Sequence, residues 1–349
     1  MASPHRATSA SDGPPLQGRA ETPIAFVNAI AQAYAARGMN PQGVLKKAQI
    51  EPRLLNNPEA RITALQMEWV SGAAMQELDD EALGWFQRRL PWGSYGMLAR
   101  ASLSAPTLGV ALKRWCRHHG LLTDDIALRV VTAGNVTRLT LHEQRPLPSA
   151  QREFCVVSVL RNALGVACWL TDSRIALTRS TFGFAPPAHA PSYRVLFDGP
   201  SEFNADGHSL QFDAGYLALP VRRDEAALQR MLQRALLLTV RPYRRDRLLV
   251  EKVRQVLARH PEHGRNADDL AAHLGLSVRT LHRQLKDEGA SLQGLKDAVR
   301  RDLALALLHK THKPIKQIAA EVGFANDKSF IRAFRTWTGQ SPEAARARM

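Results

Sequence analysis

The stretch ADDLAAHLGLSVRTLHRQLKD, residues 267–287, decides the fold of the last third of the chain. Its first eight residues have the apolar spacing of a short helix, Gly275 follows as a turn residue, and Ser277 has the position of an N-cap for a second helix. The residues expected to form the core between the helices are Leu270, Ala271, Leu276, Leu281 and Leu285. Two helices joined by a tight turn that contains glycine form a helix-turn-helix unit, which this stretch therefore predicts.

A second copy of this pattern occupies residues 315–338. Gly323 lies in its turn, and either Asn326 or Asp327 caps its second helix. An amphipathic helix expected over residues 291–310 joins the two copies and would hold them at a fixed separation. Major-groove faces of duplex DNA recur every ~34 Å, so a rigid pair of such units predicts that two recognition helices enter successive major grooves.

The second helix of each copy presents an outward face that is rich in cationic side chains. Arg283 and Arg332 hold equivalent places in the two copies, and an arginine there can donate two hydrogen bonds to guanine O6 and N7. We predict that these two arginines read bases; a phosphate contact or a solvated charge is the alternative for each. Contact with phosphates is the expected role of Lys286, Lys328 and Arg335. The complete predicted interface is Arg279, Thr280, His282, Arg283 and Lys286 in the first copy and Lys328, Ser329, Ile331, Arg332 and Arg335 in the second.

The charge of the chain favours a polyanionic partner. The 349 residues carry a net charge of +15 and a pI of about 10.3, which suits nucleic acid or an acidic membrane surface. Residues 241–349 hold 22 Lys and Arg against 12 Asp and Glu, so most of the excess lies with the two helix-turn-helix copies. Double-stranded DNA is therefore the expected partner, although a merely well-solvated basic surface would have the same composition.

Before this region, the patterns predict a domain with both helices and strands. Helices dominate at first, residues 126–141 then alternate around Gly134 as in a hairpin, and a long helix is expected over residues 150–170. Short extended stretches are expected at residues 174–178, 193–197 and 209–212. The fold class is thus an α+β N-terminal domain followed by an all-α C-terminal domain of two helix-turn-helix units joined by a long helix.

Composition and helix signals place the domain boundaries. Residues 1–21 are rich in Ser, Pro, Ala and Gly and predict a disordered leader. The first helix is expected to start with Thr22 as N-cap and Pro23 at its first position. The expected division is a disordered leader at 1–21, an α+β domain at 22–220, a linker helix and basic connector at 221–244, and a DNA-binding domain at 245–349 with helix-turn-helix units at 267–287 and 315–338.

The two copies share a pattern of residues that has a known counterpart: Leu270-Ala271, Gly275-Leu276-Ser277, Arg279-Thr280-Leu281, Arg283, Ile318-Ala319, Gly323-Phe324, Phe330, Arg332, Phe334, Gly339 and Ser341-Pro342. At these spacings the chain closely resembles the AraC/XylS family of bacterial regulators over roughly residues 245–345. Lys328 stands where the family often has serine and adds a cation beside DNA phosphate. The resemblance implies a promoter-binding regulator with RNA polymerase as a partner, and it leaves open both a homodimer and the choice between activation and repression.

The first domain contains looser motifs, among them Trp92-Gly93-Ser94-Tyr95-Gly96-Met97-Leu98, Ser104-Ala105-Pro106-Thr107-Leu108 and Phe212-Asp213. They are similar to the effector domain of a subgroup of the same family that is named after arabinose binding. This resemblance implies that residues 22–220 form an effector or regulatory domain for a small-molecule effector of unknown identity. The residues expected to form walls of the effector site are Trp92, Tyr95, Trp115 and Trp169, for which an ordinary core role is the alternative.

Enzymatic and metal-binding functions find no support in the sequence. The chain lacks GxxxxGK[ST], HExxH, GxSxG and GxGxxG motifs, so no catalytic residue and no cofactor are expected. The pairs His118-His119 and His309/His312 have no Cys or carboxylate partners nearby, so no metal site is expected. A non-specific architectural DNA-binding protein remains as the alternative function.

The expected location is the cytoplasm, without membrane attachment. The three cysteines, Cys116, Cys155 and Cys168, lie in apolar surroundings and form no CxxC pair, which suits a reducing compartment. The longest apolar stretch is interrupted by Arg161 and Asn162 and predicts a buried helix rather than a membrane span.

Overall fold

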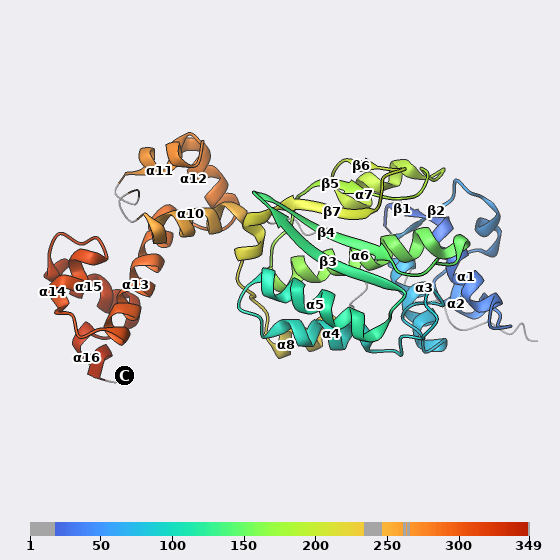
Figure 1. The fold of residues 1–349 in the computed structure, drawn as a ribbon, viewed down its shortest axis with the longest axis horizontal. Helices are drawn as coiled ribbons and strands as arrows, with labels where there is room; N and C mark the ends of the chain where they lie inside the picture. Colours follow the sequence, from blue (N-terminus) through green and yellow to red (C-terminus); the bar gives the residue numbers. More distant parts are fainter. Residues whose placement is uncertain (1–17, 234–245, 261–262, 264–265, 348–349) are drawn as a thin grey trace, which may run out of the picture. The chain divides into compact units, whose positions relative to one another are not determined.

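The computed structural model of this protein describes residues 18–233, 246–260, 263 and 266–347. The chain divides into two compact units, Met1–Tyr243 and Arg244–Met349 (Figure 1). The N-terminal unit contains helices and strands, and the C-terminal unit is built from helices. The predicted fold class is therefore confirmed.

The N-terminal unit begins with a two-stranded sheet and short helices. These elements are β1 (Ala20–Pro23), α1 (Ile24–Ala35), α2 (Gln42–Lys47), the 3-10 helix η1 (Pro52–Asn56), β2 (Arg61–Thr63) and α3 (Ala64–Glu77). β1 pairs antiparallel with β2 and leads directly into α1, whose buried face includes Phe26, Ile30 and Tyr34. Thr63 begins α3 with a capping box, because its side chain accepts from the Gln66 N–H while the Gln66 side chain accepts from the Thr63 N–H.

The first residues differ from the prediction. Ala20 and Glu21, which the predicted leader included, belong to β1, and residues 1–17 lie outside the described part of the chain. Thr22 also belongs to β1, and Pro23 is the N-cap of α1, so the expected cap at Thr22 is wrong by one residue. The pairing of Pro23 with Arg61 in β2 explains the difference, because it continues the strand through Pro23, whose ψ of 139° is extended rather than helical.

The larger part of the unit is a five-stranded sheet with helices. Its elements are α4 (Ser94–Leu103), α5 (Leu108–Leu122), β3 (Ile126–Ala133), β4 (Val136–Glu143), α6 (Ser149–Thr171), β5 (Leu177–Thr181), η2 (Ala190–Ser192), α7 (Tyr193–Phe197), β6 (Ser201–Glu202), β7 (His208–Asp213), η3 (Ala214–Ala218) and α8 (Glu225–Leu232). The strand order is β3-β4-β7-β5-β6, and the pairs are antiparallel except β5 with β6.

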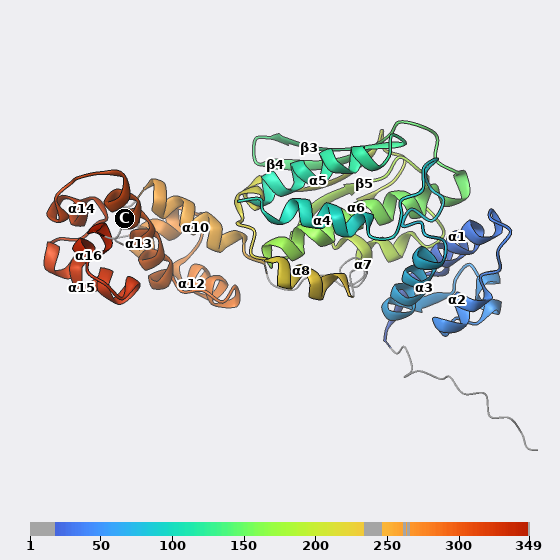
Figure 2. The same cartoon turned by 90° about the horizontal axis from the view of Figure 1, so that it is seen from below.

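One face of this sheet is buried and the other is exposed. Along β4, Leu139 and Leu141 are buried while Arg138 and His142 are exposed, which is the alternation of a half-buried strand. Helix α5 packs on β3, α6 packs on β7, and the two helices contact each other (Figure 2). The helices therefore cover the buried face and hold the core of the unit.

Two of the predicted extended stretches differ from the structure. Residues 193–197 form the helix α7, so the expected strand there is wrong. Tyr193 and Phe197 are four positions apart, which places them on one helical face, and both are buried beside Phe182. A short apolar run does not distinguish helix from strand, and the aromatic cluster decides for helix here. The stretch expected at 174–178 is shifted along the chain to β5.

Helix α6 is long and apolar enough to span a membrane by length and composition. The 18-residue window with the highest hydropathy is 78% buried within the protein. It includes Cys155 and Cys168, which are buried free cysteines. Helix α6 is thus packed as the central core helix of the N-terminal unit.

The C-terminal unit contains α10 (Leu248–Arg259), α11 (Ala267–His273), α12 (Val278–Asp287), α13 (Leu292–Lys310), α14 (Ile315–Glu321), α15 (Asp327–Thr338) and α16 (Pro342–Ala347). These helices enclose two separate apolar clusters. Leu292 and Leu295 of α13 belong to the first cluster, and Ala304 and Leu308 of the same helix belong to the second. Figure 1 shows α11 and α12 towards one end of α13 and α14 and α15 towards the other.

Glu288 ties the end of α12 to the start of α10. Its carboxylate accepts a hydrogen bond from the Val250 N–H at 2.9 Å, and the residue is 9% exposed. The pKa of Glu288 is raised to about 7, mainly by burial; the Val250 N–H opposes this shift, and the nearby Asp246 carboxylate adds to it. The folded protein therefore binds this proton more tightly than the unfolded chain, in which a glutamate pKa is about 4.3.

We predict that Glu288→Gln becomes more stable relative to the wild type as pH rises from about 5 to about 7.5. Ionisation of buried Glu288 costs the wild type stability as pH passes from the unfolded to the folded pKa, whereas glutamine does not ionise. Thermal unfolding of both full-length proteins across this pH range gives the difference between their melting temperatures. A difference that stays constant with pH would contradict the prediction.

Candidate DNA interface and effector cavity

The two helix-turn-helix units have the same turn. Gly275 and Gly323 follow the supporting helices α11 and α14 with φ of 67° and 85°, a left-handed conformation that glycine adopts without strain. The next residues donate equivalent hydrogen bonds, from the Leu276 N–H to the Ala271 oxygen at 2.8 Å and from the Phe324 N–H to the Ala319 oxygen at 2.9 Å. The small side chains of Ala271 and Ala319 are buried where the helices approach each other.

Each recognition helix, α12 or α15, starts with a side-chain cap. The Ser277 hydroxyl accepts from the Thr280 N–H, and the Asn326 side chain accepts from the Ser329 N–H. Of the two caps considered for the second copy, the structure has Asn326. The turn before it is one residue longer than in the first copy, since the N-cap follows the turn glycine by three residues rather than two.

Counting from these caps shows that the two recognition helices repeat one surface pattern. Cationic residues lie two, six and nine positions after each N-cap, and all six are exposed. Among the described residues, none of the six forms a salt bridge with an acidic side chain. The three pairs are Arg279 with Lys328, Arg283 with Arg332, and Lys286 with Arg335.

The opposite faces of the same helices are buried. Leu281 and Phe330 lie four positions after the caps, and Leu285 and Phe334 lie eight positions after them. All four are 0% exposed and belong to the two apolar clusters. Because these contacts fix each helix about its own axis, the cationic stripes must face solvent.

The other four predicted contact residues have different surroundings. His282 is exposed beside the stripe of α12, whereas Thr280 is half-buried with its hydroxyl 2.8 Å from the Ser277 hydroxyl. Ser329 is half-buried in the first turn of α15. Ile331 is half-buried and packs against the second apolar cluster, so it contributes to the core as well as bordering the exposed face.

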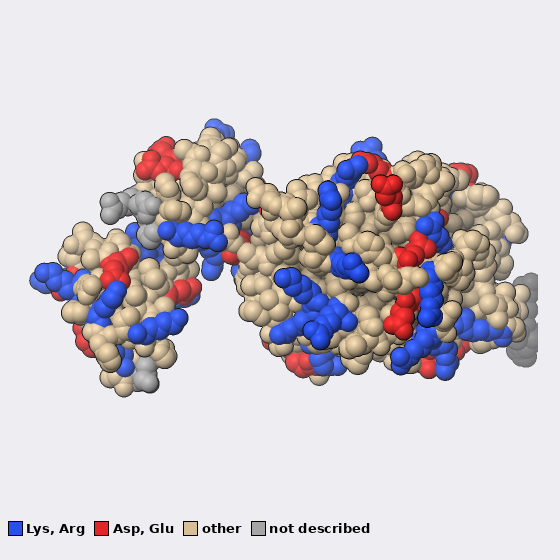
Figure 3. Space-filling model, viewed as in Figure 1, with Lys and Arg blue, Asp and Glu red and all other residues tan. Residues whose placement is uncertain are grey.

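The basic residues of the C-terminal unit are interspersed with acidic ones. Figure 3 shows Lys and Arg side chains on the visible face of this unit with Asp and Glu among them. A uniform positive surface is therefore not what distinguishes the recognition helices. The distinction lies in the spacing and exposure of their six cationic residues.

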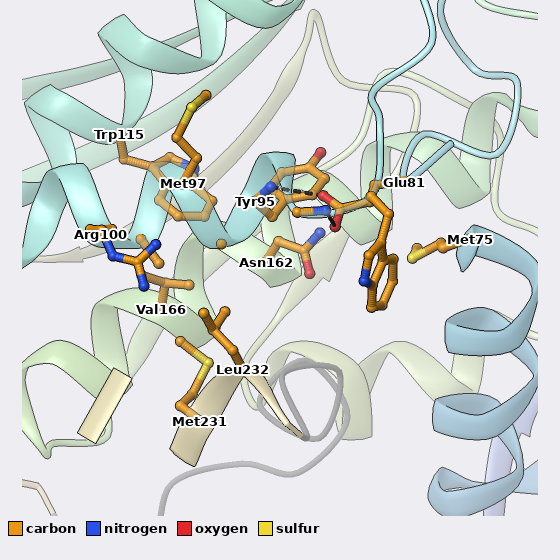
Figure 4. A pocket seen from close by; sticks show the side chains of 14 residues that line it. Met75, Glu81, Tyr95, Met97, Arg100, Trp115, Asn162, Val166, Met231 and Leu232 are labelled. Carbon is orange, nitrogen blue, oxygen red and sulfur yellow. Dashed lines mark hydrogen bonds between the residues drawn. The ribbon is translucent and has the colours of Figure 1, made fainter. Parts of the chain in front are cut away.

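The N-terminal unit contains a cavity of about 300 Å³ beside α4, α5, α6 and α8 (Figure 4). Three of the four residues expected to form effector-site walls, Trp92, Tyr95 and Trp115, line this one cavity. The rings of Tyr95 and Trp115 are stacked with their centroids 6.0 Å apart. The remaining lining residues are Met75, Glu81, Gly93, Gly96, Met97, Ala99, Arg100, Asn162, Val166, Met231 and Leu232.

Trp169, the fourth expected wall residue, lies elsewhere and does not line this cavity. It is 5% exposed on α6, and the Arg223 guanidinium lies 5.8 Å from the centre of its ring. Its place in the core agrees with the alternative role considered for large aromatic residues. The sequence offered no signal to separate Trp169 from the three cavity residues, because a large aromatic side chain suits a core and a cavity wall alike.

Glu81 is the lining residue that sequence reasoning missed and that most affects the chemistry of the cavity. Its two carboxylate oxygens accept from the Gly93 N–H and the Tyr95 N–H, each at 2.7 Å, at the start of α4 (Figure 4). Burial raises the pKa of Glu81, and the two backbone N–H groups oppose this shift. A buried carboxylate thus faces a largely apolar cavity.

A turn rich in acidic residues holds Glu81 in place. Asp80 is 1% exposed and accepts from the N–H groups of Ala82, Gly84 and Leu90, and Arg37 donates to it at 2.6 Å. These bonds fix residues 80–90 against the body of the unit. The position of Glu81 therefore depends on contacts that span many residues in sequence.

Helix α8 closes one side of the cavity through Met231 and Leu232. A Cβ atom at Gly96 would lie 3.2 Å from Leu232 Cδ2, so glycine allows α8 to approach α4 closely. At the other end of α8, Arg100 donates to both carboxylate oxygens of Glu225, with Nη2 2.7 Å from Oε1. The cavity wall thus includes the last helix described before the C-terminal unit.

Comparison with known proteins covers both units. Residues 38–221 match the family model described as the arabinose-binding domain of AraC transcription regulators, N-terminal, and residues 270–348 match a helix-turn-helix domain model. The chain is 30% identical over 333 residues to the "Ornithine utilization regulator" of Pseudomonas aeruginosa, covering 94% of this chain and 97% of that protein. It is 24% identical over 360 residues to an uncharacterized HTH-type transcriptional regulator of Mycobacterium tuberculosis, with coverage of 94% and 96%. The solved structure of the transcriptional regulator CdpR from Pseudomonas aeruginosa is similar at 22% identity, covering 93% of this chain and 98% of that one with a TM-score of 0.33.

We predict that Lys328→Gln reduces the salt dependence of DNA binding. A lysine that contacts a phosphate displaces about 0.9 counterion from duplex DNA, so the slope of log K against log salt should fall by about that amount. Lys113→Gln, a change at an exposed lysine of the N-terminal unit, is the control. The salt slopes of both variants are measured by filter binding or fluorescence anisotropy at salt concentrations of about 50 to 200 mM. An unchanged slope for Lys328→Gln would remove this residue from the interface.

Proposed function

The chain belongs to the AraC family of bacterial transcription regulators, and on this premise we propose how its two units act on a promoter. It is a sequence-specific DNA-binding transcription regulator with an N-terminal effector-binding domain. The observation that carries our proposal is the repeated surface of α12 and α15, with cationic side chains at the same three distances from two N-caps.

In the proposed complex, α12 and α15 enter successive major grooves of one promoter. Arg283 and Arg332, at the middle of the two stripes, donate pairs of hydrogen bonds to guanine. Arg279 and His282 reach neighbouring base edges, and the remaining cationic residues of the stripes contact phosphates and fix the register of the helices on the duplex. The free, unpaired state of the six cationic side chains supports this assignment, because no ion pair among the described residues must break first.

The cavity beside α8 is the proposed effector site of the N-terminal domain. An effector can regulate the protein only if it binds two conformations with different affinity. Met231 and Leu232 offer such a difference, because they line the cavity and end α8, the last described helix before the C-terminal unit. We therefore propose that occupancy of the cavity changes the position of α8 and thereby the binding of the C-terminal unit to its operator.

The remaining parts of the proposal concern partners and place of action. RNA polymerase is the proposed protein partner at the promoter, a homodimer is a proposed assembly, and the cytoplasm is the proposed location. The protein would act by binding alone, without a catalytic step of its own. One relative that covers both units is named for ornithine utilization, so L-ornithine belongs in the first screen for effectors.

Footprinting on DNA from around the gene would test the function directly. A regulator of this kind should protect two adjacent major-groove segments on one face of a defined operator. Unrelated competitor DNA should leave this protection in place, because specific sites are typically favoured by ~10³ or more. Protection that disappears equally with any competitor would refute sequence-specific binding.

We predict that Arg283→Ala and Arg332→Ala each cost ~1–3 kcal/mol of binding to the operator. Binding to unrelated DNA should change little, because the lost contacts read bases rather than phosphates. Arg117→Ala, at an exposed arginine of α5, serves as the control. Anisotropy titrations of all three variants on operator and unrelated duplexes give the comparison. Equal losses on both duplexes would show that these arginines contact phosphates.

We predict that Glu225→Gln alters operator affinity severalfold even without effector. The change weakens the paired hydrogen bonds between Arg100 and Glu225 and so loosens α8 against α4. Glu202→Gln is the matched control, because Glu202 forms an equally exposed two-pronged pair with Arg179 between β5 and β6. Faster amide hydrogen exchange in residues 225–232 should accompany the change in affinity. Faster exchange without any change in affinity would refute the proposed role of α8.

A further inference from the structure

The effector cavity has walls that suit a cation. Trp92, Tyr95 and Trp115 supply aromatic rings, and the ring faces of such residues attract ammonium groups. Met75 and Val166 make much of the remaining lining apolar. The cavity volume of about 300 Å³ lies at the lower end of the range for small-molecule sites.

The polar groups of the cavity set the sign of the ligand charge. Arg100 is the one cationic side chain among the described lining residues, and three hydrogen bonds already commit it to Glu225. Among the described residues, each oxygen of the Glu81 carboxylate accepts one backbone N–H, although a carboxylate has about four acceptor sites. Glu81 therefore keeps the capacity to accept further hydrogen bonds from a ligand.

We propose that the cavity takes a small organic molecule that carries a protonated amine, with the amine against Glu81 and beside the aromatic rings. This inference rests on the proposed effector role of the cavity. An anionic ligand would face the Glu81 carboxylate with no uncommitted cation among the described lining residues, which is unfavourable in an apolar site. A neutral ligand would leave the spare acceptor sites of Glu81 without a charged partner.

The charge of the ligand is tested with three four-carbon molecules that differ only at their ends: butane-1,4-diamine, butane-1,4-diol and succinate. Isothermal calorimetry and thermal unfolding are measured on the full-length protein. We expect the diamine to bind and to raise the melting temperature by about 5 °C when its concentration is a hundred times its Kd. The diol and succinate should give no shift. Binding of the diol or succinate as tight as that of the diamine, or no binding of the diamine, would overturn the proposal.

Two variants locate the amine within the cavity. Glu81→Gln removes the charge at nearly constant volume and should weaken the diamine tenfold or more. Trp92→Leu removes an aromatic face at a residue that is 46% exposed, so it leaves the core intact and should weaken binding about threefold. Trp69→Leu is its control, since Trp69 is 52% exposed on α3 and does not line the cavity. Equal affinity of wild type and Trp92→Leu would place the amine elsewhere and overturn the proposal even if Glu81→Gln failed to fold.

Operator binding separates this inference from the function on which it rests. Wild type, Trp92→Leu and Trp69→Leu are compared on the operator without any ligand. If all three bind the operator and the diamine test fails, the ligand class is wrong and the regulatory function stands. If wild type protects no operator, the regulatory function fails whatever the cavity binds.

Discussion

The DNA-binding unit depends on one constraint: helix α13 contributes residues to both of its apolar cores. Leu292 and Leu295 lie in the core behind α12, and Ala304 and Leu308 lie in the core behind α15. The helix has 19 residues and is therefore roughly 28 Å long, close to the ~34 Å repeat of the major groove. Because an α-helix is stiff over this length, each recognition helix is positioned by the core that its own end of α13 helps to form. In the proposed complex, the apolar contacts that stabilise the unit would thus also set the spacing of the two recognition helices on DNA.

The same reasoning explains which parts of the protein the sequence predicts well. The second helix of the first helix-turn-helix unit is expected to follow the Ser277 cap and to end at residue 287. In the structure this helix is α12, Val278–Asp287. All of its signals are local: Ser277 caps it, Gly275 makes the turn, and Leu281 and Leu285 mark one face. The pattern repeats in α15, where Asn326, Phe330 and Phe334 hold the equivalent positions. Local signals that agree with one another specify such a unit without help from distant residues.

Where predictions from the sequence are wrong, contacts with residues distant in the sequence determine the local structure. Thr22 looks like a helix cap but is held in a strand by β2, and residues 193–197 look extended but pack as a helix against Phe182. Trp169 is a large aromatic residue like the three that line the cavity, yet it lies under Arg223 rather than in the cavity. Glu81 gave no signal, because its role depends on the turn that Asp80 organises and on N–H groups at the start of α4. Single-sequence patterns contain no information about such partners until the fold brings them together.

These long-range contacts also form the structural basis of the proposed link between effector binding and DNA binding. Glu81 holds the start of α4, the Arg100–Glu225 pair joins α4 to α8, and the cavity lies beside both helices. A ligand that entered the proposed effector cavity beside Leu232 would change contacts of α8, the last described helix before the DNA-binding unit. By thermodynamic reciprocity, any effect of the ligand on operator affinity must equal the effect of the operator on ligand affinity. The proposed regulatory coupling therefore runs through α4 and α8, whose contacts can be altered one at a time.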